Sequence, residues 1–213
     1  MAAAQGSKHR IVEVGADLMS RRGLSGVTLG VLADEVGMSK SGLFAHFRSK
    51  DAIEIAILDH RAAAADRTVV EPAAGAPAGL PRLVAMMVNW LGWTARAGLR
   101  GGCPVAAGIF ELDDASGEVR ERLERIEAHW RDELVREAVE AVRAGQLSAN
   151  ADADQLVFEL FGLYLGHHAA KRFVRDPKAD ERALMALIGV LGRYGAQTGV
   201  CRDLVVAAVR RRK

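Results

Sequence analysis

The sequence contains only two cysteines, Cys103 and Cys201, in a chain of 213 residues. They lie far apart and form neither a CxxC pair nor a metal-type spacing, which excludes a disulfide framework. No uncharged apolar run approaches the roughly 20 residues that a membrane-spanning helix needs. The first residues, MAAAQGSKHR, also lack the apolar core of a secretory signal. We therefore expect a protein of the reducing cytoplasm, with no membrane partner.

The chain has little net charge of either sign, with 29 basic and 27 acidic residues and a formal charge of +2. Because half the residues are hydrophobic, whole-chain disorder is excluded. The distribution of charge is more informative, since residues 1–50 contain more basic than acidic side chains and the last four residues are all basic. This pattern permits an anionic partner at the N-terminal end. The basic C-terminal tail is expected to be a solvated end, with attraction to DNA as the weaker alternative.

Strand patterns are missing as well, because no segment shows strict alternation of apolar and polar residues between tight turns. Apolar residues instead recur three or four apart, which predicts an all-α fold. The stretch 70–81, with three prolines and two glycines, predicts a connector between two functional halves. The predicted helices cover residues 8–22, 28–36, 39–47, 49–65, 81–97, 103–112, 118–144, 153–174, 180–194 and 201–213.

Residues 28–47 have the pattern of a helix-turn-helix. Gly37 suits a left-handed turn between two short helices, and Ala33 is small where the helices approach. The spacing predicts an outward face that is small and polar and can enter the major groove of DNA. A plain helical hairpin is an equal alternative on spacing alone. The predicted inward residues are Leu32, Val36, Met38, Leu43 and Phe47, with Phe44 on the same side of its helix, and the outward residues are Lys40, Ser41, Gly42, Ala45 and His46.

The stretch from Ile11 to Ile53 resembles the DNA-binding domain of TetR-family transcriptional regulators. The most specific matches are Gly23, Thr28, Ala33, the Val36-Gly37 pair and the segment SKSGLFAHFRSK. The resemblance implies a three-helix helix-turn-helix DNA-binding domain over residues 1–54. It also implies a larger helical effector-binding and dimerisation domain over residues 55–213, with a homodimer and double-stranded operator DNA as partners.

Carried over by position, the resemblance makes residues 40–46 the recognition helix. Lys40, Ser41 and Gly42 would approach base edges, and Ala45 would lie near a thymine methyl group or the sugars. The residues that would meet phosphates, and so fix register rather than sequence, are Thr28, His46 and Lys50. Two positions depart from the family pattern: Phe44 replaces a tyrosine that reaches a phosphate, and Gly30 has no side chain to read a base. Arg48 is a candidate substitute for the missing phosphate contact.

The second half is rich in large flexible or flat side chains, which line apolar ligand sites but also fill ordinary cores. Trp90, Trp130 and Tyr164 are the best candidates for ligand contact, because each joins apolar area to a hydrogen-bond donor. The histidines His129, His167 and His168 lack a metal-type setting and are expected to be polar pocket or interface residues. The candidate pocket set is Met86, Met87, Trp90, Trp93, Phe110, Trp130, Phe158, Phe161, Tyr164 and His167.

Gly162 and Gly166 lie one turn apart on an apolar helix, where small residues let two helices approach closely. With the following helix they could form a four-helix bundle at a two-fold axis, or simply pack inside one subunit. A dimer of this kind predicts a pseudo-palindromic operator. The candidate interface set is Gly162, Gly166, Leu184, Leu187, Ile188 and Leu191.

No nucleophile with a base, glycine-rich phosphate loop or HExxH motif is present, and the Asp113-Asp114 pair stands alone. We therefore predict no enzyme, no cofactor and no metal. The leading hypothesis is a ligand-responsive repressor that an unknown small apolar or aromatic effector releases from DNA. Two alternatives remain open: a DNA-binding regulator controlled by a protein partner without a small ligand, and an activator.

Overall fold

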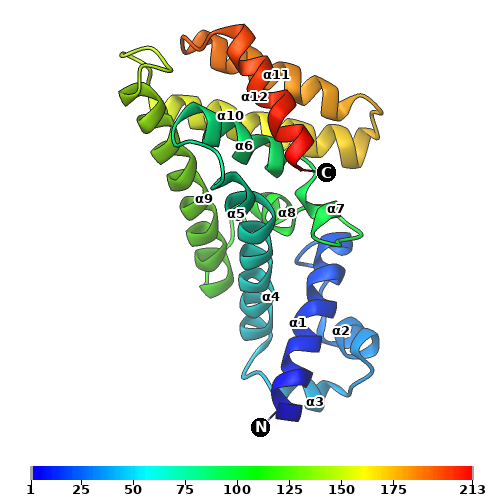
Figure 1. The fold of residues 1–213 in the computed structure, drawn as a ribbon. Helices are drawn as coiled ribbons and strands as arrows, with labels where there is room; N and C mark the ends of the chain where they lie inside the picture. Colours follow the sequence, from blue (N-terminus) through cyan, green and yellow to red (C-terminus); the bar gives the residue numbers. More distant parts are fainter. Residues whose placement is uncertain (1, 213) are drawn as a thin grey trace. The chain divides into compact units, whose positions relative to one another are not determined.

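The computed structural model describes residues 2–212, with side chains from Gln5 onward. Within this range the chain is helical and contains no strand, so the all-α prediction is confirmed (Figure 1). The elements are α1 (Ala2–Arg22), α2 (Leu29–Val36), α3 (Lys40–Phe44), α4 (Lys50–Ala65), the π-helical turn η1 (Asp66–Val70), α5 (Glu71–Ala73), α6 (Leu80–Trp90), α7 (Trp93–Arg96), α8 (Pro104–Glu111), α9 (Glu118–Arg143), α10 (Ala153–Ala169), the π-helical turn η2 (Ala170–Val174), α11 (Ala179–Arg193) and α12 (Thr198–Arg211).

The predicted helix boundaries agree with the structure where a capping residue marks them, and differ from it at other places. α1 begins at Ala2 rather than at residue 8. The predicted connector over 70–81 is largely wrong, because helical structure continues through Ala73 and resumes at Leu80. Pro81 lies in the first turn of α6, where the missing N–H needs no partner, so this proline starts a helix instead of breaking it. The predicted helix over 81–97 is in turn divided at Gly92, which has a positive φ of 72°.

The Cα packing divides the chain into two compact units. The N-terminal unit consists of the residues up to Ala64 together with Thr94–Glu127. The C-terminal unit consists of Ala65–Trp93 together with the residues from Ala128 onward. The predicted domains 1–54 and 55–213 stay a prediction.

In the N-terminal unit, α1 packs against α2 and α8, around fully buried residues such as Leu18, Leu32 and Leu43. The segment 94–127 is attached to α1 by polar contacts. The Arg100 guanidinium donates to the Asp17 carboxylate, and the Gly102 N–H donates to the Ser20 carbonyl at 2.8 Å. Gly101 is required here, because an added Cβ would lie 1.9 Å from the Ser20 carbonyl oxygen.

In the C-terminal unit, α12 packs against α6 and α11, and α10 packs against α11 (Figure 1). The Arg212 side chain donates to the carbonyls of Val88 and Leu91, at 2.8 and 3.0 Å, where α6 ends. The expectation of a wholly solvated basic tail is therefore wrong for Arg212, because these orphan carbonyls attract a cation. Lys213 lies outside the described residues.

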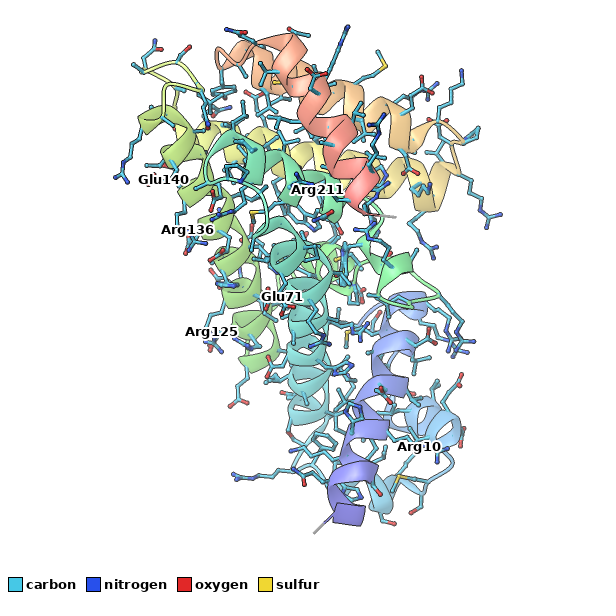
Figure 2. All side chains as sticks on the ribbon, viewed as in Figure 1. Arg10, Glu71, Arg125, Arg136, Glu140 and Arg211 are labelled. Atoms are coloured by element: carbon cyan, nitrogen blue, oxygen red, sulfur yellow. The ribbon has the colours of Figure 1, made fainter. Side chains whose placement is uncertain are left out.

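Helix α9 carries charge along its exposed side, where Arg125, Arg136 and Glu140 project from it (Figure 2). Arg125 pairs with Glu121 one turn earlier, and Arg136 pairs with Glu133. Such pairs keep the helix face in water. Among the described residues, no helix has the length and apolar character needed to cross a membrane.

Candidate nucleic-acid interface and small-molecule site

Local hydrogen bonds set the geometry of the helix-turn-helix. Thr28 caps α2, since its hydroxyl oxygen accepts from the Val31 N–H at 3.2 Å. Gly37 ends α2 with φ of 74° and ψ of 39°, the left-handed conformation that glycine adopts without strain. Ser39 then caps α3, accepting from the Gly42 N–H at 3.0 Å. The predicted left-handed turn at Gly37 is confirmed.

The structure largely reproduces the predicted inward and outward sides of α2 and α3. Leu32, Val36, Leu43 and Phe47 are buried, and Met38 is partly buried. The placement of Phe44 beside Leu43 and Phe47 is wrong, because the Phe44 ring is 46% exposed. Its position in the sequence puts it on the outer side of a short helix, so this ring is a large apolar group on the candidate DNA surface.

The recognition helix is shorter than predicted, because α3 ends at Phe44 and Ala45 and His46 follow in a turn. Lys40, Ser41 and Ala45 are exposed. Gly42 is only partly exposed, since a Cβ there would lie 3.4 Å from both Met38 Cε and Ser39 Oγ. A side chain at position 42 would thus point toward the turn and not squarely outward.

Gly30 has a structural consequence for Lys40. A Cβ at Gly30 would lie 3.6 Å from Lys40 Cε and 3.9 Å from Lys40 Nζ. The lysine chain therefore extends over the space that a side chain at position 30 would occupy. The missing side chain on α2 makes room for the basic side chain on α3.

A cavity of about 530 Å³ lies beside the start of α4. Its lining includes the basic residues Lys8, His46 and Arg48, with Asp59 and Glu118 also lining it. Sequence reasoning missed Lys8, whose ammonium group lies 5.1 Å from the centroid of the Phe47 ring, in a cation–π arrangement. The only available signal was a basic residue one turn before the apolar stripe of α1.

Lys50 forms an ion pair that the sequence did not reveal. Its Nζ lies 2.7 Å from Oε1 of Glu54, one turn later on α4. The Glu54 side chain is 8% exposed, whereas that of Lys50 is 43% exposed. Burial raises the pKa of the Glu54 carboxyl group, although the hydrogen bond from Lys50 opposes this shift.

In the C-terminal unit, four of the predicted pocket residues form one aromatic cluster: Trp90, Trp130, Phe161 and Tyr164. Trp90 stacks on Tyr164, with ring centroids 4.1 Å apart, and on Trp130 at 5.8 Å. The Trp93 Nε1–H donates to the Tyr164 hydroxyl at 3.0 Å. Met86 and Met87 are fully buried in the same unit. The predicted set is thus brought together, but its rings pack on one another.

Three predicted pocket residues lie elsewhere. The Phe110 side chain is 65% exposed on α8, in the N-terminal unit, and Phe158 is 70% exposed on α10. Both residues lie on the exposed side of their helix, away from the side that carries the buried residues. His167 is outside the aromatic cluster but lines a separate cavity of about 300 Å³ between α10 and α11, and its Nε2 lies 2.7 Å from Oδ1 of Asp180.

The ionisable groups around His167 influence one another. Burial disfavours the Asp180 carboxylate, but hydrogen bonds from Lys171 and His167 outweigh this effect and lower its pKa. Burial lowers the pKa of the neighbouring His168 and so favours its neutral form. His129 is exposed on α9. Among the described residues no group of three His, Cys, Asp or Glu side chains could hold a metal ion.

The predicted dimer residues divide into two groups. Gly162 and Gly166 are exposed, and a Cβ at either would meet nothing within 4 Å, while Leu184 and Ile188 are partly exposed. Leu187 and Leu191 have no exposed surface, so assigning them to an interface is wrong. They lie on the side of α11 that packs inside the unit. Sequence reasoning missed Met185, 66% exposed on the opposite side of α11.

Comparison with known proteins gives the family. Residues 79–187 match the model described as tetracyclin repressor-like, C-terminal domain, and residues 11–57 match that of bacterial regulatory proteins, tetR family. The chain therefore belongs to the TetR family of transcriptional regulators. It is a helix-turn-helix, DNA-binding regulator and not an enzyme, as the sequence predicted. No curated protein matches the chain in sequence.

Solved structures share the fold at low identity. A TetR transcriptional regulator from Chloroflexus aurantiacus is 24% identical with a TM-score of 0.80, and the match covers 88% of this chain and 94% of that one. A TetR-family regulator from Cytophaga hutchinsonii is 18% identical with a TM-score of 0.79, covering 92% and 98%. AibR, solved with isovaleryl coenzyme A and operator DNA, is 22% identical with a TM-score of 0.70, covering 87% and 97%.

Proposed function

We propose that this regulator is a cytoplasmic repressor that binds a pseudo-palindromic operator as a homodimer and is released by a small apolar or aromatic effector. Residues 1–54 would bind DNA, and residues 55–213 would bind the effector and form the dimer. The observation that carries the proposal is the exposed face of α3, which bears Lys40, Ser41 and the Phe44 ring and is held by caps on both sides of the Gly37 turn. A helix presented in this way fits the major groove.

The proposed DNA contacts divide by chemistry. Lys40 and Ser41 would reach base edges, with Gly42 and Ala45 allowing close approach. Thr28, His46, Arg48 and Lys50 would bind phosphates. Thr28 can do so while capping α2, because its hydroxyl oxygen accepts from Val31 and its proton is left to donate. The exposed Phe44 ring can contact a thymine methyl group or the sugars, in place of the phosphate contact of a tyrosine.

The proposed dimer interface is the exposed apolar face of α10 and α11. It comprises Phe158, Gly162 and Gly166 on α10 and Leu184, Met185 and Ile188 on α11. Phe158 is followed one and two turns later by the exposed glycines Gly162 and Gly166, so the side chains of a second copy could enter the spaces beside the glycines. Burial of Phe158 and Met185, each mostly exposed in one chain, would stabilise the dimer.

The effector would bind at the aromatic cluster. AibR was solved with a coenzyme A thioester, and a gamma-butyrolactone receptor has the same fold, with 22% identity to this chain. These likenesses support a small-molecule effector. Because Trp90 and Tyr164 stack at 4.1 Å, an effector would have to separate these rings. The same observation favours a second candidate, a regulator without a small ligand that is controlled by a protein partner.

DNA binding is tested with duplexes selected from a random library, measured by fluorescence anisotropy over a salt series. The selected sites should contain two related half-sites, and binding should weaken with salt. Lys40→Ala should weaken specific binding by about 10- to 100-fold, in line with the loss of one base contact. Arg202→Ala, which removes an exposed arginine on α12, is the matched control. Selection that returns no preferred sequence would contradict the proposal.

The effector is tested by thermal shift across a library of apolar and aromatic compounds. A true effector raises the melting temperature by mass action and also releases the protein from its operator. A compound that binds tightly but leaves operator affinity unchanged is not an effector. If no compound stabilises the protein, the candidate controlled by a protein partner takes its place.

A further inference from the structure

A buried carboxylate lies next to the lysine that is proposed to bind a DNA phosphate. Glu54 is on the second turn of α4, and its Oε1 lies 2.7 Å from Lys50 Nζ. Its side chain is 8% exposed. Lys50 is a half-exposed residue at the first position of α4. The ammonium group of Lys50 thus contacts the buried Glu54 carboxylate and also lies at the surface that would face DNA.

The surroundings of Glu54 favour its neutral form. Burial disfavours the carboxylate, and the negative charges of Asp51 on α4 and Glu111 on α8 act in the same direction. Lys50 is the positive group that opposes them. Glu111 is itself engaged, since its carboxylate accepts from the backbone N–H groups of Leu24 and Ser25 at 3.1 and 2.8 Å. The ionised state of Glu54 therefore depends largely on one ion pair.

A phosphate that approaches Lys50 changes the equilibrium between the ionised and the protonated form of Glu54. The lysine has three donors, and any donor turned toward a phosphate weakens its attraction for Glu54. The phosphate also adds a negative charge close to a carboxylate that solvent hardly screens. Both effects favour protonation of Glu54 when DNA is bound.

We propose that Glu54 is a positioning residue that restrains the contact of Lys50 with DNA and takes up a proton when DNA binds. The inference rests on the proposed function, in particular on the phosphate contact of Lys50. By linkage, uptake of a proton on binding means that DNA affinity rises as pH falls. At high pH the intact Lys50–Glu54 pair weakens the attraction of this surface for DNA.

The test uses the full chain and a random-sequence 30-base-pair duplex, because phosphate contacts are independent of sequence. Affinity is measured by anisotropy from pH 5.5 to 8. Proton uptake is measured by calorimetry in two buffers of different ionisation enthalpy. Glu54→Gln keeps the shape and the acceptor but cannot titrate. It should bind about 3- to 10-fold more tightly than the wild type at pH 8, with a shallower pH profile and less proton uptake.

Asp51→Asn is the matched control, since it also removes one negative charge from the start of α4 but leaves the ion pair in place. It should bind DNA more tightly and still take up the proton, with a pH profile as steep as that of the wild type but displaced to lower pH, because Asp51 no longer raises the pKa of Glu54. His46, which lines the same cavity, is present in all these proteins, so its contribution to DNA binding cancels in the comparison. Lys50→Gln removes the coupling itself, so it should also lower proton uptake, which keeps the inference testable if Glu54→Gln fails to fold.

Equal proton uptake by the wild type and Glu54→Gln would overturn the inference. So would a pH profile of Glu54→Gln that runs parallel to the profile of the wild type. A wild-type protein that binds no DNA at any pH would overturn the proposed function first, and this inference with it.

Discussion

The helix-turn-helix and the aromatic cluster are held together over very different distances in the sequence. Each bond that shapes the turn joins residues close in the chain, such as Thr28 to Val31 and Ser39 to Gly42. The aromatic cluster instead depends on Trp93 and Tyr164, which are 71 positions apart. A short sequence motif is enough to predict the helix-turn-helix. The aromatic cluster, in contrast, forms only after several helices have packed together.

The largest expected effect is on the packing of the C-terminal unit. Leu187→Ala should lower the free energy of unfolding by about 3 kcal/mol, because it opens a cavity beneath α11. Met185→Ala, on the exposed side of the same helix, should change the folding of one chain by less than about 0.5 kcal/mol. The measurement is urea unfolding at several protein concentrations.

The two variants should also differ in assembly. Met185→Ala should raise the dimer dissociation constant in sedimentation, and its loss of stability should depend on protein concentration. The loss in Leu187→Ala should be present at every concentration. Equal losses in both variants would show that the two sides of α11 do not differ as the structure has them.

A smaller effect is expected where local bonds decide the structure. Ser39→Ala removes the cap of α3 and should cost about 1 kcal/mol. The loss of the cap should be detected as faster hydrogen exchange at the Gly42 amide, because this amide loses its acceptor. Ser25→Ala is the matched control, because it deletes the same atom from an exposed position before α2 and leaves Ser39 and its bonds in place. If exchange at Gly42 stays slow in Ser39→Ala, the turn does not depend on its cap.

The smallest effect concerns the contact between α1 and the segment 94–127. Hydrogen bonds from Arg100 lower the pKa of Asp17 below its ordinary value of 3.8. A lowered pKa stabilises the fold above the pKa of the unfolded chain, and this contribution is lost as pH falls through the folded-state value. Asp17→Asn should therefore melt about 2 °C lower than the wild type at pH 7.

That difference should shrink as the pH is lowered from 4 to 2, because the Asp17 carboxylate of the wild type takes up a proton as the pH falls toward its lowered pKa. Thermal unfolding at four pH values checks the prediction. Asp113→Asn, at an exposed acid on the turn after α8, is the control and should melt like the wild type throughout. A difference that stayed constant with pH would mean that Asp17 acts through packing and not through its charge.

The sequence was a good guide to the helices and to the turn at Gly37, and a poor guide to which side of each helix is buried. It predicted the α2–α3 turn because Gly37 and Ser39 act on their own neighbours. It placed Leu187 and Leu191 in an interface because an apolar stripe looks the same whether a helix of the same chain or of another chain covers it. It missed the Lys50–Glu54 pair because a spacing of four residues does not say which carboxylate is buried.

The sequence by itself determined the helical fold, the helix-turn-helix and the family. These features rest on periodicity and on caps, which act within one or two turns. Only the tertiary structure decided that Phe110 and Phe158 are exposed, that His167 contacts Asp180 and that Trp90 stacks on Tyr164. Burial and partners depend on which helix faces cover one another, and that is a property of the packed helices and not of any single segment.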